Sequence, residues 1–157
     1  MAKLKINIDE NISIEGQNYG SKRTLTIDGI TEVFKRIVSC PANNETTIAS
    51  FHGEVYSDES TLDKEDVKYI RVTNLDSSNS LTLSLQIDVG EDDTSADESA
   101  SILLGAGQSF TMGTPHDSVG VLDANANLVT DLVDLESLIV QPGSNAIDVE
   151  ILVASAS

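Results

Sequence analysis

The stretch Ser80-Leu81-Thr82-Leu83-Ser84-Leu85-Gln86-Ile87-Asp88-Val89 alternates polar and apolar residues without a break. Successive side chains of a β-strand point to opposite faces of a sheet, so this period of two places all the apolar side chains on one face. The segment from Ile147 to Val153 repeats the pattern, with Asp148 and Glu150 expected in solvent and the β-branched residues inside. These two segments predict sheets that each bury one face.

The other apolar residues also fall in short segments with turn residues between them. About ten short strands, with turn signals roughly every eight to twelve residues, are typical of a sandwich or barrel. We therefore predict an all-β fold: one antiparallel β-sandwich or jelly roll over residues 1–157, with a loose N-terminal start and a frayed tail at 154–157. Because only 4% of the residues are aromatic, the core should be aliphatic. The expected strands are 3–8, 12–14, 24–27, 30–39, 46–55, 67–73, 81–89, 102–104, 108–112, 119–122, 138–141 and 147–153.

One segment leaves room for a short helix. Leu128, Leu132, Leu135 and Leu138 recur at spacings of four and three. Side chains at these spacings share one face of a helix. The prediction therefore allows at most one short helix here, and a polar loop over 57–66.

Turn chemistry predicts how some of the strands are connected. Asp28-Gly29, between 24–27 and 30–33, is the strongest hairpin signal in the chain. A two-residue turn would set Leu25 opposite Glu32, however, so a bulge or a longer loop would be needed.

Two further turns predict how other strands are connected. The run of Asn, Asp and Ser over 74–79 predicts that 67–73 pairs antiparallel with 81–89. The glycine-rich segment 105–108 does not open a helix and has no lysine, so it predicts a tight turn between adjacent strands instead of a phosphate site.

Charge is distributed unevenly along the chain. The net charge is −17, and all nine lysines and arginines lie between Lys3 and Arg71. A chain this acidic repels nucleic acid and anionic lipid, since affinity for phosphate depends on Lys and Arg. The charge either serves solubility alone, or marks an acidic part that faces outward while the mixed-charge part docks.

Cysteine usage and hydropathy suggest a cytosolic origin. Cys40 is the single cysteine, so no internal disulfide can form and no oxidising compartment is required. No apolar run approaches the roughly 20 residues of a membrane span. The first residues enter an alternating pattern directly, without a signal peptide. We expect no membrane partner.

Few residues are candidates for chemistry. Asp88, Glu91, Asp92 and Asp93, in an acidic loop, could offer oxygen ligands to a cation, but the D-x-D-x-D-G pattern of a calcium loop is missing. A solvated loop is the plainer interpretation.

The histidines and the cysteine do not form a recognisable catalytic pattern. His52 and His116 belong to no H-x-x-x-H or H-E-x-x-H cluster. Cys40 could act as a nucleophile with His52 as its base, yet a lone cysteine at a strand end is usually buried packing. We predict no enzymatic activity and no cofactor.

Several segments of the second half resemble a known class of protein. The run Tyr69-Ile70-Arg71-Val72-Thr73-Asn74-Leu75-Asp76-Ser77-Ser78-Asn79, the alternating strand after it, and Ile102-Leu103-Leu104-Gly105-Ala106-Gly107-Gln108-Ser109-Phe110 form one pattern. It is similar to that of small virion structural proteins of tailed bacteriophages, especially marine ones. The resemblance covers roughly 67–153 and brings no catalytic residues with it.

The resemblance implies a head decoration or cement subunit that stabilises the head of a virion assembled in the host cytoplasm. Its implied partners are further copies of itself, as a trimer, and the major capsid or another virion protein. The docking face would use the basic residues of the first half, such as Lys22, Arg23, Lys35 and Arg36. A phage tail or fibre accessory protein and a stand-alone glycan or cell-surface binding module remain as alternatives.

Overall fold

The computed structural model describes residues 2–52, 61–63, 66–87, 98–113 and 135–156. In these residues the chain is all-β, as predicted, and contains no helix, so none that could cross a membrane. The strands are β1 (Ala2–Asp9), β2 (Ser13–Ile14), β3 (Gln17–Asn18), β4 (Lys22–Ile30), β5 (Glu32–Cys40), β6 (Thr46–His52), β7 (Thr61–Asp63), β8 (Val67–Asn74), β9 (Leu81–Ile87), β10 (Glu98–Leu104), β11 (Ser109–Met112), β12 (Leu135–Pro142) and β13 (Ile147–Ser155).

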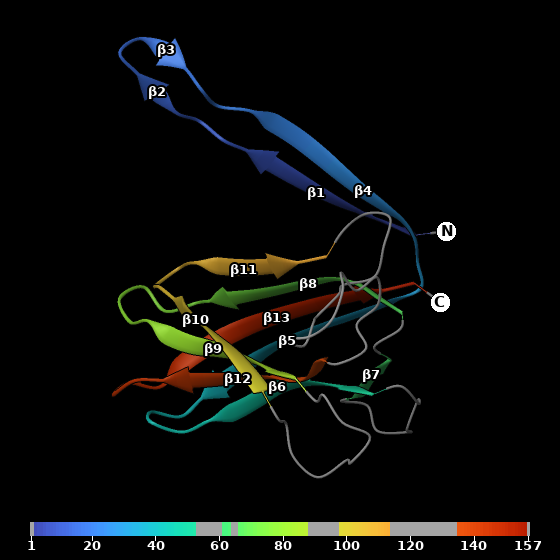
Figure 1. Ribbon diagram of the computed structural model, residues 1–157, viewed down its shortest axis with the longest axis vertical. Coiled ribbons are helices and arrows are strands. Elements are labelled where there is room, and N and C mark those ends of the chain that lie inside the picture. Colours follow the sequence, from blue (N-terminus) through green and yellow to red (C-terminus); the bar gives the residue numbers. More distant parts are fainter. Residues whose placement is uncertain (1, 53–60, 64–65, 88–97, 114–134, 157) are drawn as a thin grey trace.

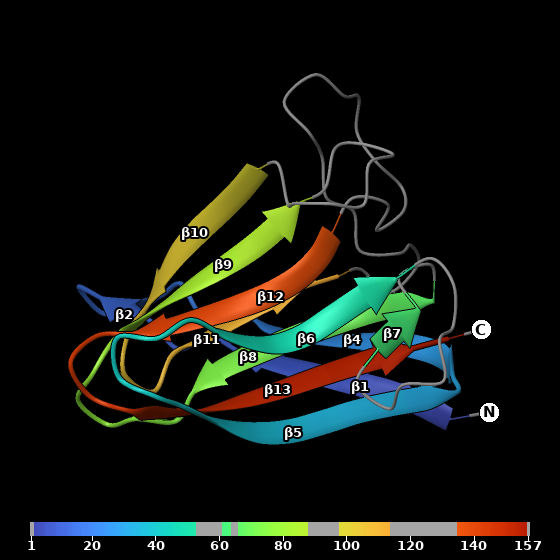
Figure 2. The ribbon, with the colours of Figure 1, turned by 90° about the horizontal axis from the view of Figure 1, so that it is seen from below.

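Two stacked sheets form the body of the molecule (Figure 2). One has the order β11-β8-β13-β5 and the other β10-β9-β12-β6-β7. Without the short β7, successive strands cross between the sheets except at β9 and β10, which are neighbours in one sheet. This is the order of a jelly roll, with the first and last strands as neighbours. All their pairings are antiparallel, whereas β7 joins β6 in parallel. The sandwich or jelly-roll prediction is confirmed in its jelly-roll form.

The core between the sheets is aliphatic, as the composition predicted. The alternating strand β9 buries Leu81, Leu83, Leu85 and Ile87, and β13 buries its four β-branched residues from the opposite sheet. Burying one such side chain stabilises the fold by about 1.5–3 kcal/mol relative to leaving it in water. The largest fully buried side chains are Ile70, Leu81, Leu83, Leu135, Leu138, Ile151, Val67, Val72, Val140, Val149 and Val153.

Residues 2–30 form a two-stranded ribbon that leaves the sandwich (Figure 1). Strands β1 and β4 pair from Ala2↔Ile30 to Asp9↔Lys22, and β2 and β3 continue the hairpin to its tip. The tip turns at Glu15 and Gly16, whose φ angles of 51° and 82° match the hairpin turn that needs two positive φ values. We call residues 2–30 the ribbon and the stacked sheets the body.

The ribbon is anchored to the body at its root. Ile27 and Ile30 form a second buried cluster with Tyr69 of β8 and Ala154 of β13. Leu4, Ile6, Leu152 and Ala156 pack around this cluster. The outer face of the four-stranded sheet is therefore covered at one end by the ribbon root.

The hairpin predicted at Asp28-Gly29 is wrong. Strand β4 runs through both residues, and β1 is its partner, so Leu25 pairs with Ile6 instead of lying opposite Glu32. Gly29, at φ 77°, is the extra residue of a bulge between the pairs Ala2↔Ile30 and Lys3↔Asp28. Glycine at positive φ serves a bulge as well as it serves a turn, so the local signal was ambiguous.

The predicted pairing of 67–73 with 81–89 is also wrong. Strand β8 pairs with β11 and β13, and β9 pairs with β10 and β12, in the other sheet. Turn 105–108 likewise carries the chain between sheets, from β10 to β11. A strand with one apolar face can bury it by stacking across a sandwich as readily as beside its neighbour in sequence, so alternation alone could not decide the pairing.

Three smaller expectations are settled by the structure. Leu135 and Leu138 lie on strand β12, where a bulge at Glu136 lets both face the core despite their spacing of three. The tail does not fray before Ser155, because β13 continues to it and the Ala156 N–H donates to the Asp66 carbonyl at 2.8 Å. The loop predicted over 57–66 contains β7. The expected strand 119–122 and residues 128–134 lie outside the described residues.

Candidate interaction surfaces

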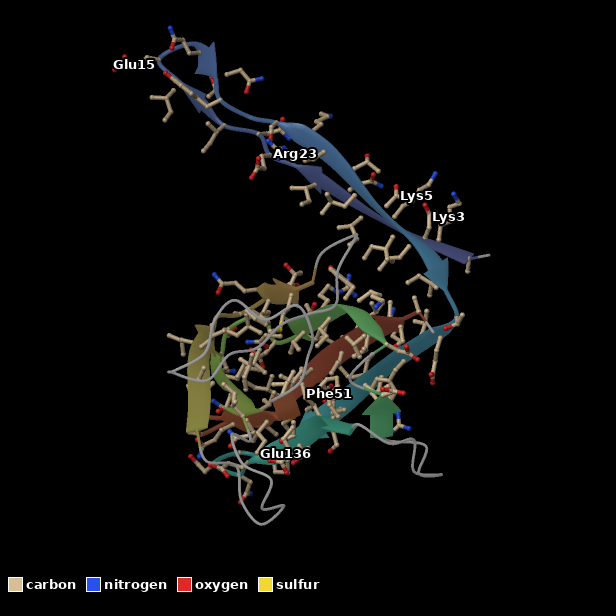
Figure 3. All side chains as sticks on the ribbon, turned by 45° about the vertical axis from the view of Figure 1, so that its right-hand side comes forward. Lys3, Lys5, Glu15, Arg23, Phe51 and Glu136 are labelled. Carbon is tan, nitrogen blue, oxygen red and sulfur yellow. The ribbon has the colours of Figure 1, made fainter. Side chains whose placement is uncertain are left out.

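The pairing of β1 with β4 sorts the ribbon side chains into two faces. The run Lys-Leu-Lys-Ile-Asn-Ile over 3–8 puts its apolar residues on one face, where Leu4 and Ile6 meet apolar residues of β4 and Ile8 meets Arg23. Lys3 and Lys5 extend from the opposite face, away from the body (Figure 3). We call the apolar face the underside; it consists of Leu4, Ile6, Ile8, Leu25 and Ile27.

The underside becomes more exposed with distance from the root. Ile27 is 2% exposed, Ile6 is half-buried and Ile8 is 41% exposed. A cavity of about 140 Å³ opens between the underside and Tyr69, Thr111 and Gly113 of the body. The ribbon therefore diverges from the sheet and leaves part of its apolar face without a cover.

The ribbon tip exposes a second apolar group, which we call the tip patch: Ile12, Ile14 and Tyr19. They are 53%, 58% and 62% exposed. The Tyr19 N–H donates to the Ile12 carbonyl at 2.9 Å, and Ile14 pairs with Gln17, so the three side chains share one face of the hairpin. Glu15 lies at the end of the ribbon farthest from the body (Figure 3).

Strand β5 presents a long edge of the four-stranded sheet. All nine of its residues pair with β13 on one side, and no described strand pairs with it on the other. Its outer face exposes Val33 (57%) and Ile37 (62%), with Lys35 between them. Charged residues such as Lys35 and Arg36 are typical of edges that must not pair indiscriminately. Arg36 lies over the Phe34 ring at 4.7 Å.

Three charges are linked across the outer face of this sheet. Glu150 on β13 accepts hydrogen bonds from Lys35 of β5, at 3.1 Å, and from Arg71 of β8. The hydrogen bond from Lys35 and the charges of both cations hold the pKa of the Glu150 carboxyl below its usual value. The Arg71 Nε is buried without a hydrogen-bond partner among the described residues. The group ties three strands together and keeps Lys35 next to Val33 and Ile37.

The outer face of the five-stranded sheet is polar and nearly uncharged. Register aligns Leu103, Thr82 and Gln141 in one row and Ser101, Ser84 and Ile139 in the next. A groove of about 270 Å³ runs over these rows, and Glu45 is its one described charged residue. Gln86 and Ser101 donate hydrogen bonds to the Ser84 hydroxyl at 2.8 and 3.3 Å. We call it the polar groove.

The four basic residues predicted to form a docking face lie on two elements. Lys22 and Arg23 begin β4, at the end of that strand remote from the body, where Lys22 pairs with Asp9 at 2.8 Å. Lys35 and Arg36 are neighbours on β5, so their side chains leave opposite faces of the sheet. The structure thus places the four on the ribbon and on the β5 edge, and does not join them in one patch.

Most of the residues considered as metal ligands or catalytic groups lie outside the described part of the chain. Asp88, Glu91, Asp92, Asp93 and His116 lie outside the described residues, as does the side chain of His52. Cys40 is fully buried, and this burial raises the pKa of its thiol. Its interpretation as core packing is confirmed. In the described residues no three His, Cys, Asp or Glu side chains gather where they could hold a metal ion.

Sequence reasoning missed the ribbon as a separate element. The signal that could have revealed it is charge: residues 1–30 hold four cations and four acids, so they are neutral. The other five cations and 22 acids give the rest of the chain the whole net charge of −17. The ribbon shares regular alternation with strands of the body, and its neutral charge is what sets it apart from the strongly acidic remainder.

Comparisons with known proteins give little further guidance. No family model matches the chain, and no curated protein matches it. A solved structure described as "Bacillus endospore appendages form a novel family of disulfide-linked pili" is similar at 12% identity and a TM-score of 0.39. The similarity covers 82% of this chain and 89% of that one. At that score the similarity decides neither fold nor function.

Proposed function

We propose that this protein is a non-enzymatic structural subunit of a tailed-bacteriophage virion, assembled in the host cytoplasm, where it decorates and cements the head. The observation that carries the proposal is the ribbon, an arm with an uncovered apolar face that is anchored to a rigid jelly roll. Monomeric soluble proteins rarely leave contiguous apolar surface exposed, and larger exposed patches mark interaction sites. An arm of this kind would suit a subunit that attaches to a shell.

The distribution of hydrophobic residues supports attachment through the ribbon. Of the eight large hydrophobic residues that are exposed among the described residues, Ile8, Ile12, Ile14 and Tyr19 are on the ribbon. The jelly roll itself adds only an analogy, since viral shell proteins and lectins both use this fold. The ribbon is the feature that favours an assembled protein.

The charge of the body suits the outside of a particle. Residues 31–157 carry the whole net charge of −17, so decorated particles would repel one another at short range, within a Debye length of about 8 Å at physiological salt. The neutral ribbon can approach an anionic shell at little electrostatic cost. We therefore expect the ribbon to face the particle and the acidic body to face solvent.

Cryo-electron microscopy of native particles tests the proposal directly. We expect jelly-roll density at regular positions on the head, with the ribbon toward the shell. Density on the tail or fibres would assign the accessory role instead. Absence of the protein from purified particles would overturn both assignments.

A binding assay tests the basic residues. Stripped particles are mixed with purified protein, sedimented and analysed for bound subunit. Charge reversal at Lys22, Arg23, Lys35 and Arg36 together should abolish binding if these residues dock. Unchanged binding by a variant that remains folded, as judged by its β-type far-UV circular dichroism spectrum, would exclude them.

The polar groove supports a second candidate, a glycan-binding module. Hydroxyl and amide side chains in three adjacent strands can exchange hydrogen bonds with a polyhydroxylated ligand, and Leu103 offers an apolar contact at the edge of the same face. Calorimetry with neutral oligosaccharides should then show saturable binding that the Gln86→Ala and Ser101→Ala substitutions weaken. Asn7→Ala, on the ribbon, is the matched control and should bind normally.

A further inference from the structure

We propose that the ribbon tip of one copy docks on the outer face of β5 in a second copy of this chain. The contact joins the tip patch and Glu15 of one molecule to Val33, Lys35 and Ile37 of the next. It leaves the underside of the ribbon for attachment to a particle, and it extends beyond that attachment because it concerns how the subunits join one another and needs no particle to form.

The tip patch lies beyond the reach of its own body. The ribbon leaves the sandwich at its root and extends away from it, and Glu15 marks its far end (Figures 1 and 3). Ile12, Ile14 and Tyr19 are each more than half exposed, while Ile27 at the root is buried. No described residue of the body covers these three side chains, so they are available to another molecule.

Strand β5 is the best receptor that the body offers. Its nine residues make it the longest of the four edge strands, since β10 has seven, β11 has four and β7 has three. Its outer face also exposes two of the three large hydrophobic residues of the body that are more than half exposed; the third is Leu103 on β10. An apolar pair next to an open edge can accept both side chains and main-chain hydrogen bonds.

Charge favours a second copy as the occupant. Residues 31–157 of each copy carry −17, so two copies that met through these residues would repel one another, whereas a neutral ribbon meets no such repulsion. The described cations of the body, Lys35, Arg36, Lys68 and Arg71, all lie on β5 and β8 of one sheet. Lys35 is held between Val33 and Ile37 by Glu150, which places a cation where Glu15 of an incoming tip would arrive.

The geometry of such a contact is head to tail. Each chain has one tip and one β5 edge, so every copy can donate once and accept once, and such contacts either close into a ring or propagate. A ring of three copies would be the trimer that the resemblance to virion proteins implies. A tip of about 12 residues on a strand of nine is small beside the usual 20–30 residues a side, so one contact should be weak, on the order of micromolar, and ring closure should strengthen it.

Complementation between two variants tests the direction of the contact. Ile12→Ser with Ile14→Ser disables the tip, and Val33→Ser with Ile37→Ser disables the edge; all four side chains are exposed, so folding should be retained. Sedimentation velocity should show wild-type protein associating with concentration, and each variant alone should associate at least tenfold more weakly. An equimolar mixture should form 1:1 heterodimers, because one variant keeps its edge and the other its tip.

A control and three contrary outcomes make the test decisive. Leu103→Ser, which changes a side chain that is more exposed than Val33 or Ile37 but lies on β10, should associate as wild type does. Wild type that stays monomeric up to about 1 mM overturns the inference, as does an edge variant that still self-associates or a mixture that does not complement. Any of these failures would leave the particle assignment standing, because that is judged on particles and not on free subunits.

Discussion

Asn74 is a fully buried amide that holds together two turns of the body. Its Nδ2 donates to the carbonyls of Asn79, Leu104 and Gly105 at 2.8, 3.2 and 3.0 Å, and its Oδ1 accepts from the Asp76 N–H at 3.0 Å. The side chain thereby supplies hydrogen bonds where the chain crosses between sheets. An apolar side chain there would leave the Leu104 carbonyl buried without that partner.

We predict that Asn74→Leu lowers the free energy of unfolding by about 2–4 kcal/mol, from the lost hydrogen bonds and the unsatisfied carbonyls. Urea denaturation followed by circular dichroism measures the change. Asn7→Ala, an exposed asparagine on the ribbon, should change it by no more than about 0.5 kcal/mol. A loss of similar size in both variants would mean that burial of Asn74 is not what matters.

Asp76 makes the same turn sensitive to acid. Its Oδ1 accepts the N–H groups of Ser78 and Asn79 at 2.7 Å each, and the bond from Ser78 is the largest cause that lowers the pKa of this carboxyl. Since the folded pKa lies below the unfolded value of about 3.9, the stabilisation is complete above that value. It is lost as pH falls from there through the folded pKa.

We predict that Asp76→Asn flattens the acid limb of the stability curve. Wild-type midpoints in urea should decline below about pH 4, and the variant should decline less over the same range because its amide does not titrate. Glu45→Gln, an exposed side chain with no hydrogen bond among the described residues, serves as the control and should keep the wild-type slope. Parallel curves for wild type and Asp76→Asn would contradict the assignment.

At the scale of elements, the bulge at Gly29 sets the join between the ribbon and the body. The positive φ of 77° lies between Ile27 and Ile30, the two residues that anchor the root. An added Cβ would meet no atom within 4 Å, so the cost of a substitution comes from the backbone alone. Left-handed backbone costs a residue with a side chain about 1–2 kcal/mol.

We predict that Gly29→Val loosens the root and spares the sandwich. Hydrogen exchange should speed up at the amides of β1 and β4, while β9 and β12 keep their protection. Gly143→Val, which is equally uncrowded but has no positive φ, should leave both regions unchanged. Uniformly faster exchange in Gly29→Val would show that the ribbon and the body unfold as one unit.

A strand could be predicted from sequence where it buries only one of its two faces. The strands around Leu83 and Ile151 carry a period of two that fixes both their type and their buried face. The partner of each strand could not be predicted, because the dipeptide Asp28-Gly29 suits a bulge within a strand as well as a turn between two strands. Bulges also mislead: the extra residue Glu136 shifts the phase of β12, so its leucines imitate helical spacing.

At the scale of the whole molecule, the net charge is the main feature expected to affect stability. Residues 31–157 carry −17, and the described ion pairs among them are few, the best formed being the group around Glu150. Self-repulsion of this size opposes the compact state and is screened by salt.

We predict that the melting temperature rises between 10 mM and 500 mM NaCl, by about 2–4 °C for each kcal/mol of repulsion removed. Scanning calorimetry measures the shift. Choline chloride should act equally, because screening does not depend on which cation is used. A melting temperature that stays flat or falls would show that repulsion is not a significant term.

The candidate surfaces were only partly foreseeable. Clustering of basic residues in the first half singled out Lys35, which the structure places beside Val33 and Ile37. The tip patch could not be found in this way, because exposure of Ile12, Ile14 and Tyr19 depends on the ribbon leaving the body. Nothing in their local sequence separates them from core residues.

The position of β13 between β5 and β8 governs how the chain is made. The four-stranded sheet is held together by β13, which is synthesised after all the other described strands. More than a hundred residues are therefore made between β5 and its partner strand. Contacts this distant in sequence make folding slow and keep the nascent chain open to chaperones and proteases. A premature stop codon before Ile147 would leave β5 without a partner strand and β8 with β11 alone, and such products should be degraded.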